Sequence, residues 1–231
     1  MNRKQGAKNQ VHIIKCNTMT RAEEQIPAQQ TGRQTDFAYD KTFETEKAAH
    51  AGFLKAADRL TDVSNWHEYA GPGSSKFCLT NNLGGELVGR AKEGFYFNIN
   101  LPVPGSDAGN GLEWVMIEQM TFEGNESTDE EYITMTVRPV PNPKKDEPEI
   151  AHFYKEASTS TFIIARKGKI VTAGIHGRNE SPNNTDVDLH DKIRNTIVAL
   201  SARAGFSGPQ WKMLAQGLIE YDEKAKEKTK N

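Results

Sequence analysis

Residues 94–101 read GFYFNINL, and the alternation of apolar and polar side chains in this stretch decides the fold class. An extended strand places successive side chains on opposite faces. One face of such a strand carries four apolar residues, Phe95, Phe97, Ile99 and Leu101. The stretch therefore predicts a β-strand of an antiparallel sheet.

Strand-like segments lie on both sides of this one. An alternating segment covers 112–122, and shorter apolar segments cover 76–80 and 132–137. Two more, at 162–167 and 170–177, are joined by a short glycine-containing turn, as in a hairpin. Because glycine and proline clusters separate the segments, the central region predicts about six antiparallel strands.

Helical patterns lie outside the strand region. Apolar residues repeat at the spacing of one helical face over 43–60 and again over 189–204. A third such segment, 207–221, starts with Ser207 and Gln210 at the spacing of a capping box. Because strands are grouped and helices lie at the ends, we predict an α+β fold, with one helix before the sheet and two C-terminal helices after it.

Polar composition sets the expected domain boundaries. Residues 1–38 are rich in Gln, Asn, Thr, Arg and Lys, and such a segment buries too little apolar surface to offset the entropy of ordering it. We predict a flexible polar N-terminal segment over 1–38, a single α+β domain over 39–221 and a charged C-terminal tail over 222–231.

Charge and hydropathy limit the cellular setting. The net charge is −2, and basic residues gather toward the ends, so the body of the chain is mildly acidic and unsuited to binding nucleic acid. No stretch approaches the roughly 18 consecutive apolar residues of a membrane span, and the N-terminus lacks the apolar run of a secretory signal. We therefore predict a cytoplasmic protein that binds neither nucleic acid nor membrane. The oligomeric state is left open.

Recognisable catalytic and metal-binding motifs are missing from the sequence. The glycines do not have the spacing of a phosphate-binding loop, and no serine has the spacing of a nucleophile elbow. No two of the six histidines are three or four residues apart, and the two cysteines, Cys16 and Cys78, are distant in sequence. We therefore predict no catalytic residue, no metal site and no cofactor.

One polar cluster follows a predicted strand. Four side chains with hydrogen-bonding heads surround a glycine there, and they are His176, Arg178, Asn179 and Glu180. Such a cluster at a strand end is able to hold an anion or a polar ligand. The alternative is a structural role, in which the cluster ties down the loop that contains Pro182.

Aromatic residues form the second candidate site. Trp66 and Trp114, together with Phe95, Phe97 and Tyr69, are able to line a cavity for an apolar ligand. The alternative is that these side chains fill the core, since large aromatic residues are generally buried.

Several sequence blocks resemble a family of bacterial cytosolic proteins from the Bacteroidota. The resemblance extends from about Ala48 to Ile219 and implies no activity. The blocks that carry it are GFYFNINLPVPG, LEWVMIEQM, VRPVPNP, TSTFIIARKG, IHGRNESPN and GFSGPQWKMLAQGL.

The order of elements resembles that of START/Bet v1-like helix-grip proteins. The carrying features are the helix and break FLKAADRLTDVSNW at 53–66, the strands after it and a long terminal helix. The resemblance implies a curved antiparallel sheet around a C-terminal helix, often with an apolar ligand between them. This sequence departs from that order in ending with two helices, and its first strand is supplied only if 36–42 forms one. A rival is a small SH3-like barrel built from residues 86–140.

Three functional hypotheses follow. The leading one is a non-catalytic binding or interaction module with an unknown protein partner. The second is a helix-grip protein that binds a small apolar ligand, with a cavity lined by Trp66, Phe95, Phe97 and Trp114. The third is an enzyme that uses the polar cluster at 176–180.

Overall fold

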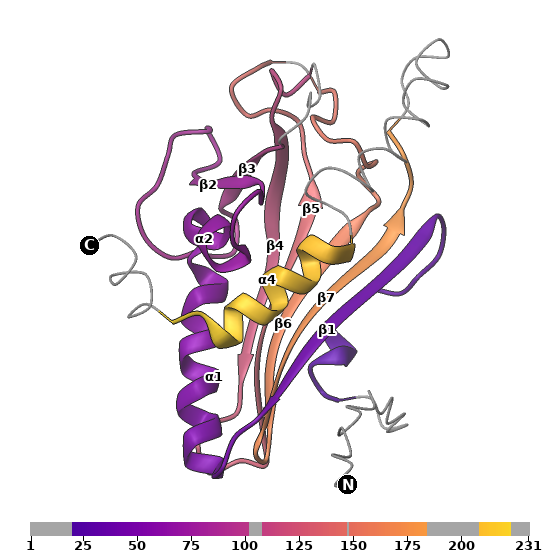
Figure 1. Cartoon of the computed structure of the whole chain (residues 1–231). Helices are drawn as coiled ribbons and strands as arrows, with labels where there is room; N and C mark the ends of the chain where they lie inside the picture. The colour runs from indigo at the N-terminus through magenta and orange to yellow at the C-terminus, as the bar shows by residue number, and fades with distance from the viewer. Residues whose placement is uncertain (1–19, 102–107, 147, 184–207, 223–231) are drawn as a thin grey trace, which may run out of the picture.

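The computed structural model of the chain describes residues 20–101, 108–146, 148–183 and 208–222. It contains one antiparallel sheet in the strand order β1-β7-β6-β5-β4-β3-β2 (Figure 1). The strands are β1 (Arg33–Thr42), β2 (Lys76–Thr80), β3 (Tyr96–Asn100), β4 (Glu113–Glu123), β5 (Glu130–Pro139), β6 (Thr159–Lys167) and β7 (Ile170–Glu180).

The helices pack together on one face of this sheet. They are α1 (Glu46–Thr61), α2 (Trp66–Ala70) and α4 (Gly208–Glu220), with a short 3-10 turn, η2 (Val63–Asn65), between α1 and α2. Another 3-10 turn, η1 (Glu23–Gln25), precedes β1, and its neighbours Ala22 and Ile26 pack on the other face of the sheet with Tyr132 and Ile163. In Figure 1, α4 crosses the front of the sheet, and α1 stands beside it. α4 contacts β1 and β7, and it also contacts α1 and α2.

The sheet has seven strands, so the prediction of about six is wrong by one. The additional strand is β1, which pairs with β7 at one edge of the sheet. Its side chains alternate between exposed polar residues and half-buried ones such as Phe37 and Tyr39. An edge strand with one polar face has a composition close to that of a loop, and only 36–42 was considered as a strand. β1 begins at Arg33, before the predicted domain boundary at residue 38. The division of the chain into 1–38, 39–221 and 222–231 stays a prediction.

The helix order is only roughly as predicted. α1 begins after Thr45, whose hydroxyl accepts the Ala48 N–H at 3.1 Å as an N-cap. A second, short helix, α2, follows α1, so two helices and not one lie between β1 and β2. The predicted helix at 189–204 and its neighbour Ser207 lie outside the described residues.

The SH3-like alternative is wrong, because residues 86–140 supply β3, β4 and β5 as neighbouring strands of the single sheet. Within the described residues, the order is one strand, two helices, six strands and a helix that crosses the sheet. The strand before the helices, the antiparallel strands after them and the crossing helix agree with the helix-grip resemblance.

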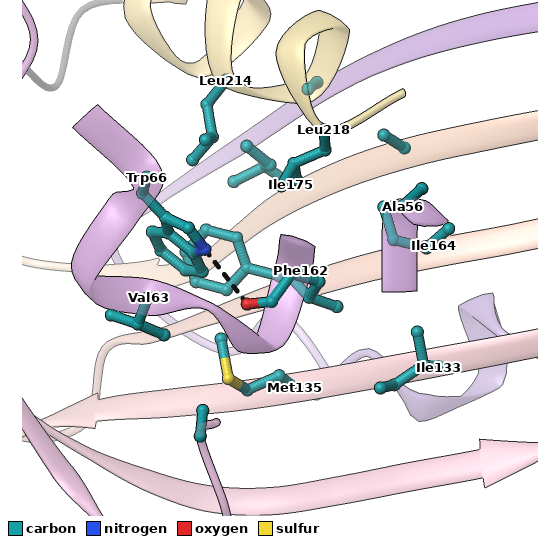
Figure 2. Packing of buried hydrophobic residues seen from close by; sticks show 14 of the residues in the cluster. Ala56, Val63, Trp66, Ile133, Met135, Phe162, Ile164, Ile175, Leu214 and Leu218 are labelled. Carbon is teal, nitrogen blue, oxygen red and sulfur yellow. Dashed lines mark hydrogen bonds between the residues drawn. The ribbon is translucent and has the colours of Figure 1, made fainter. Parts of the chain in front are cut away.

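The main core lies between the sheet and the helices, with Trp66 near its centre. Figure 2 shows Leu214 and Leu218 of α4 reaching toward Ile175 of β7 and toward Trp66. Met135 of β5 and Phe162 of β6 complete this layer from the sheet. Burial of these apolar groups is what holds α4 against the strands.

Two contacts fix where α4 crosses. The buried guanidinium of Arg59 on α1 donates hydrogen bonds to the carbonyls of Leu218 at 3.1 Å and Tyr221 at 2.7 Å, and so caps the C-terminal end of α4. A Cβ atom added to Gly217 would lie 1.9 Å from the Tyr69 carbonyl oxygen, so only glycine permits this close crossing of α2 and α4.

Candidate ligand-binding cavity

A cavity of about 270 Å³ lies between the sheet and the helices. Its apolar lining comes from β1, α2, β2–β6, the loop before β6 and α4, and consists of Phe37, Trp66, Phe77, Phe97, Ile99, Val115, Val137, Phe153, Phe162 and Trp211. Its polar lining comes from β1, the loop between β5 and β6, β6 and the end of β7, and consists of Arg33, Thr35, His152, Tyr154, Ser160 and Glu180.

Trp66 anchors the aromatic wall of the cavity. Its ring centroid lies 4.7 Å from that of Phe162, 5.2 Å from that of Phe77 and 5.8 Å from that of Phe97. The indole N–H donates to the Leu60 carbonyl at 3.0 Å, at the end of α1. Because its polar atom is satisfied by the helix end, the fully buried Trp66 presents only apolar surface to the cavity.

The predicted aromatic cluster is divided by the sheet. Trp66 and Phe97 line the cavity, whereas Trp114 packs on the opposite face with Val140 and Ala151. β4 alternates, so Val115 points to the cavity and its neighbour Trp114 points away. Phe95 is half-buried against the core cluster but does not line the cavity.

The predicted polar cluster contains a β-bulge. Thr35 pairs with Gly177 and Arg33 pairs with Glu180, so two residues of β7 lie opposite one residue of β1. Asn179 has a φ of 56°, in the left-handed region that asparagine tolerates better than most residues. Its side-chain oxygen also accepts the Gln30 N–H at 2.8 Å, which ties the segment before β1 to β7.

The bulge separates the cluster onto two faces. His176 and Arg178 lie on the face away from the cavity, where both contact one oxygen of Asp36, at 2.7 Å and 2.8 Å. Burial alone would raise the pKa of Asp36, but hydrogen bonds from Gln34, His176 and Arg178 together lower that pKa. Glu180, beyond the bulge, lines the cavity. Strand alternation alone would have put it on the same face as Arg178.

Glu180 is the buried acidic group of the cavity. The residue is 7% exposed, and its Oε1 accepts a hydrogen bond from the Thr35 hydroxyl at 3.0 Å. Its Oε2 has no hydrogen-bond partner among the described residues. Burial raises the pKa of the Glu180 carboxyl, against the opposing effects of the Thr35 hydrogen bond and the charges of Arg33 and Arg178. A Cβ on Gly177 would lie 2.1 Å from Oε1, so the glycine leaves room for this carboxylate.

The loop between β5 and β6 brings to the cavity residues that were not predicted from the sequence. The loop is held by the Phe153 N–H, which donates to Glu113 Oε2 at 2.6 Å, and by Asn183 Nδ2, which donates to the His152 carbonyl at 3.1 Å. These contacts place His152 and Tyr154 in the lining. The only signal in the sequence is the local run of His and two aromatic residues, which has no distinctive spacing.

His152 is a neutral member of the cavity wall. Its Nδ1 accepts the Tyr154 N–H at 2.9 Å, so we assign the proton of the neutral ring to Nε2. Burial lowers the pKa of His152 to about 3, since the 6% exposed ring cannot solvate a positive charge. Burial also raises the pKa of Tyr154, and the charge of Glu180 adds to that shift.

We expect His152 to make the protein less stable as the pH falls. The unfolded chain protonates this histidine near pH 6.5 and the folded chain only near pH 3, so between these values the unfolded state binds more protons. The free energy of unfolding should fall by about 2 kcal/mol between pH 7.5 and pH 5 through this group. Denaturant titration of the wild type and of His152→Asn, which keeps an acceptor for the Tyr154 N–H, measures the difference. Equal pH profiles for the two proteins would contradict the assignment.

The described residues include no group of three or more His, Cys, Asp or Glu side chains placed to hold a metal ion. Within the same residues, each helix is too short or too polar to cross a membrane.

No protein-family model and no curated protein matches the chain. Solved structures that resemble it at low identity include the following three. Protein Ms6760 from Mycobacterium smegmatis is 9% identical over 82% of this chain and 92% of that one, with a TM-score of 0.36. Ara h 8.0201 is 10% identical over 79% and 99%, with a TM-score of 0.29. The major latex-like protein 151 from Panax ginseng is 12% identical over 73% and 95%, with a TM-score of 0.30. None of these values indicates a shared function, and membership of a bacterial family stays a prediction.

Proposed function

We propose that the protein binds a small molecule with a largely apolar body in the cavity between the sheet and the helices. The cavity itself, with its wall of Trp66, Phe97 and Phe162, is the observation that supports this proposal. Ligand sites in proteins are typically concave and mostly apolar, with a few convergent polar groups. The cavity described above combines an aromatic wall with a substantial polar part, since six of its sixteen lining residues are polar.

The size of the cavity favours a small ligand. Its volume of about 270 Å³ lies just below the usual range of ligand pockets, which is about 300–1,000 Å³. A ligand bound there would bury apolar surface. Each Å² of apolar surface removed from water favours binding by about 25 cal/mol. The proposal therefore concerns compounds with one or two fused rings, or an equivalent aliphatic body, and not long lipids.

This proposal is the second of the three hypotheses drawn from the sequence, and it is narrower than the first. It leaves out His176 and Arg178, because both lie on the face away from the cavity and contact Asp36. It also leaves out Trp114, which packs on the face of the sheet opposite the cavity. The protein-interaction hypothesis names no surface, and the enzyme hypothesis would have to use Glu180 without the other members of its cluster.

Filling the cavity is expected to abolish binding. Ser160 lines the cavity from β6, and Ser160→Phe would place a ring in the volume that the ligand needs. We expect the affinity for 2-methylnaphthalene, measured by calorimetry, to fall at least tenfold relative to the wild type. Ser127→Phe is the matched control, because Ser127 is exposed in the turn between β4 and β5. Unchanged binding by Ser160→Phe, with Ser127→Phe also unchanged, would show that the probe binds elsewhere.

The natural ligand is best sought in the protein purified from its own host. Native mass spectrometry before and after mild denaturation would reveal a small molecule that leaves on unfolding. A second polypeptide in the complex would instead support the interaction module.

A further inference from the structure

We propose that the ligand carries a hydrogen-bond donor without negative charge, such as a hydroxyl, amide or amine, and that Glu180 Oε2 accepts this donor. The inference rests on the proposed function, since it assigns the polar head of the molecule whose body occupies the cavity. Hydroxyl, amide and amine groups share the chemistry that matters here, which is an N–H or O–H directed at a carboxylate.

The first observation is the incomplete bonding of a buried carboxylate. Glu180 is 7% exposed, and Thr35 supplies a partner for Oε1 only. Among the described residues nothing bonds to Oε2. Buried polar atoms in proteins are nearly always bonded, and an exception at a cavity wall points to a partner that comes from outside the chain. A donor on a ligand supplies that partner.

The second observation is the way in which the backbone directs Glu180. The bulge at Arg178 and Asn179 puts the carboxylate on the cavity face, and Gly177 leaves the space beside it that any side chain would fill. The bulge and Gly177, both in β7, therefore together determine where the Glu180 side chain lies. A carboxylate on the opposite face would have met His176 and Arg178, which are already paired with Asp36.

The charges around the cavity argue against an anionic ligand head. His152 is neutral, because its Nδ1 accepts the Tyr154 N–H. Arg33 also lines the cavity, but it is an exposed residue whose charge water screens. Arg178 lies beyond the bulge on the other face, paired with Asp36. The charges of Arg33 and Arg178 act on Glu180 itself, so a ligand carboxylate would meet the Glu180 carboxylate and would have only the screened charge of Arg33 within the lining to offset the repulsion.

Four probes with one naphthalene body test this assignment. 2-Methylnaphthalene carries an apolar head, 2-naphthalenemethanol a neutral donor, 2-naphthalenemethylamine a cationic donor and 2-naphthoate an anion. With the wild type at neutral pH, we expect the alcohol and the amine to bind at least several-fold more tightly than 2-methylnaphthalene. We expect the affinity for 2-naphthoate to be lower than the affinity for the amine by about tenfold or more.

Variants then assign the effect to one side chain. Glu180→Gln removes the negative charge and offers an amide N–H, so the amine should lose about tenfold in affinity and 2-naphthoate should gain. Glu130→Gln is the matched control, because Glu130 also has an unpartnered buried oxygen but does not line the cavity. It should keep the wild-type ranking. Thermal unfolding verifies that each variant is folded, and the wild-type ranking stands as a test by itself.

The outcomes separate the two proposals. If 2-methylnaphthalene binds and the four heads make no difference, or if 2-naphthoate binds most tightly, the assignment of Glu180 is overturned while the cavity function remains. If Glu180→Gln leaves the ranking unchanged, the donor meets another group and the assignment is again overturned. If no probe binds to the folded wild type, the proposed function fails first.

Discussion

Replacing Arg166 by methionine should lower the free energy of unfolding by about 3–5 kcal/mol, one of the two largest effects that we expect in this protein. Arg166 and Glu131 are each 1% exposed, and the Arg166 Nε–H donates to Glu131 Oε1. Arg166 also donates to the carbonyl of Thr128 at 2.8 Å, while His50 Nδ1 lies 2.6 Å from Glu131 Oε1. Removing the cation leaves the buried Glu131 carboxyl group without its guanidinium partner, beside the His50 imidazole.

The Arg166–Glu131 pair as a whole should contribute far less to the free energy of unfolding than the loss in Arg166→Met suggests. Burial of two charges costs about as much as their attraction returns, so the double variant Arg166→Met/Glu131→Leu should recover most of the stability lost in either single variant. Urea denaturation of the four proteins gives the coupling energy. Arg138→Met is the control, because its pair with Glu118 is partly exposed and should be worth about 1 kcal/mol or less. Losses that simply add in the double variant would contradict this account.

Truncation of Trp66 should have an effect of similar size on the free energy of unfolding. Trp66→Ala removes a fully buried indole that contacts Phe77, Phe97 and Phe162, and such truncations cost about 3–5 kcal/mol. It should also weaken binding of 2-methylnaphthalene, because the wall of the cavity is lost. Urea denaturation and calorimetry measure the two effects on the same protein.

The conservative variant Trp66→Phe separates the contribution of ring packing to stability from that of the indole hydrogen bond. Trp66→Phe retains an aromatic ring but loses the N–H that donates to the Leu60 carbonyl, so it should cost less than Trp66→Ala. Trp211→Ala is the control. Trp211 also lines the cavity, but it is half-buried near the start of α4, so its truncation should lower the free energy of unfolding by less. A loss below about 1 kcal/mol for Trp66→Ala would mean that the indole is not the centre of the core.

Local patterns allowed most of the sheet to be predicted from the sequence. The alternation at 94–101 and the hairpin of β6 and β7 were both predicted, because side-chain period and turn composition are properties of neighbouring residues. β1 escaped full recognition because its outer face is polar and its inner face is only half-buried, as suits an edge strand.

The cavity was predicted less well, for reasons of long-range structure. Trp114 was grouped with Trp66, since single-sequence alternation says which residues share a face within a strand but not which face meets the helices. The direction of Glu180 depends on a bulge defined by the pairing of β7 with β1. His152 and Tyr154 reach the cavity only because distant residues such as Glu113 and Asn183 hold their loop.

The bulge in β7 has a further consequence for how this strand tolerates changes in length. Because Asn179 is the extra residue opposite β1, deleting it would remove the bulge and would also move Glu180 one position nearer to Arg178 along β7, so the bulge and the residue that it redirects would change together. Such a deletion would also remove the anchor that Asn179 provides for Gln30 and Thr31. The extra residue at position 179 thus attaches the segment before β1 to the sheet and, in this sequence, places Glu180 on the cavity face.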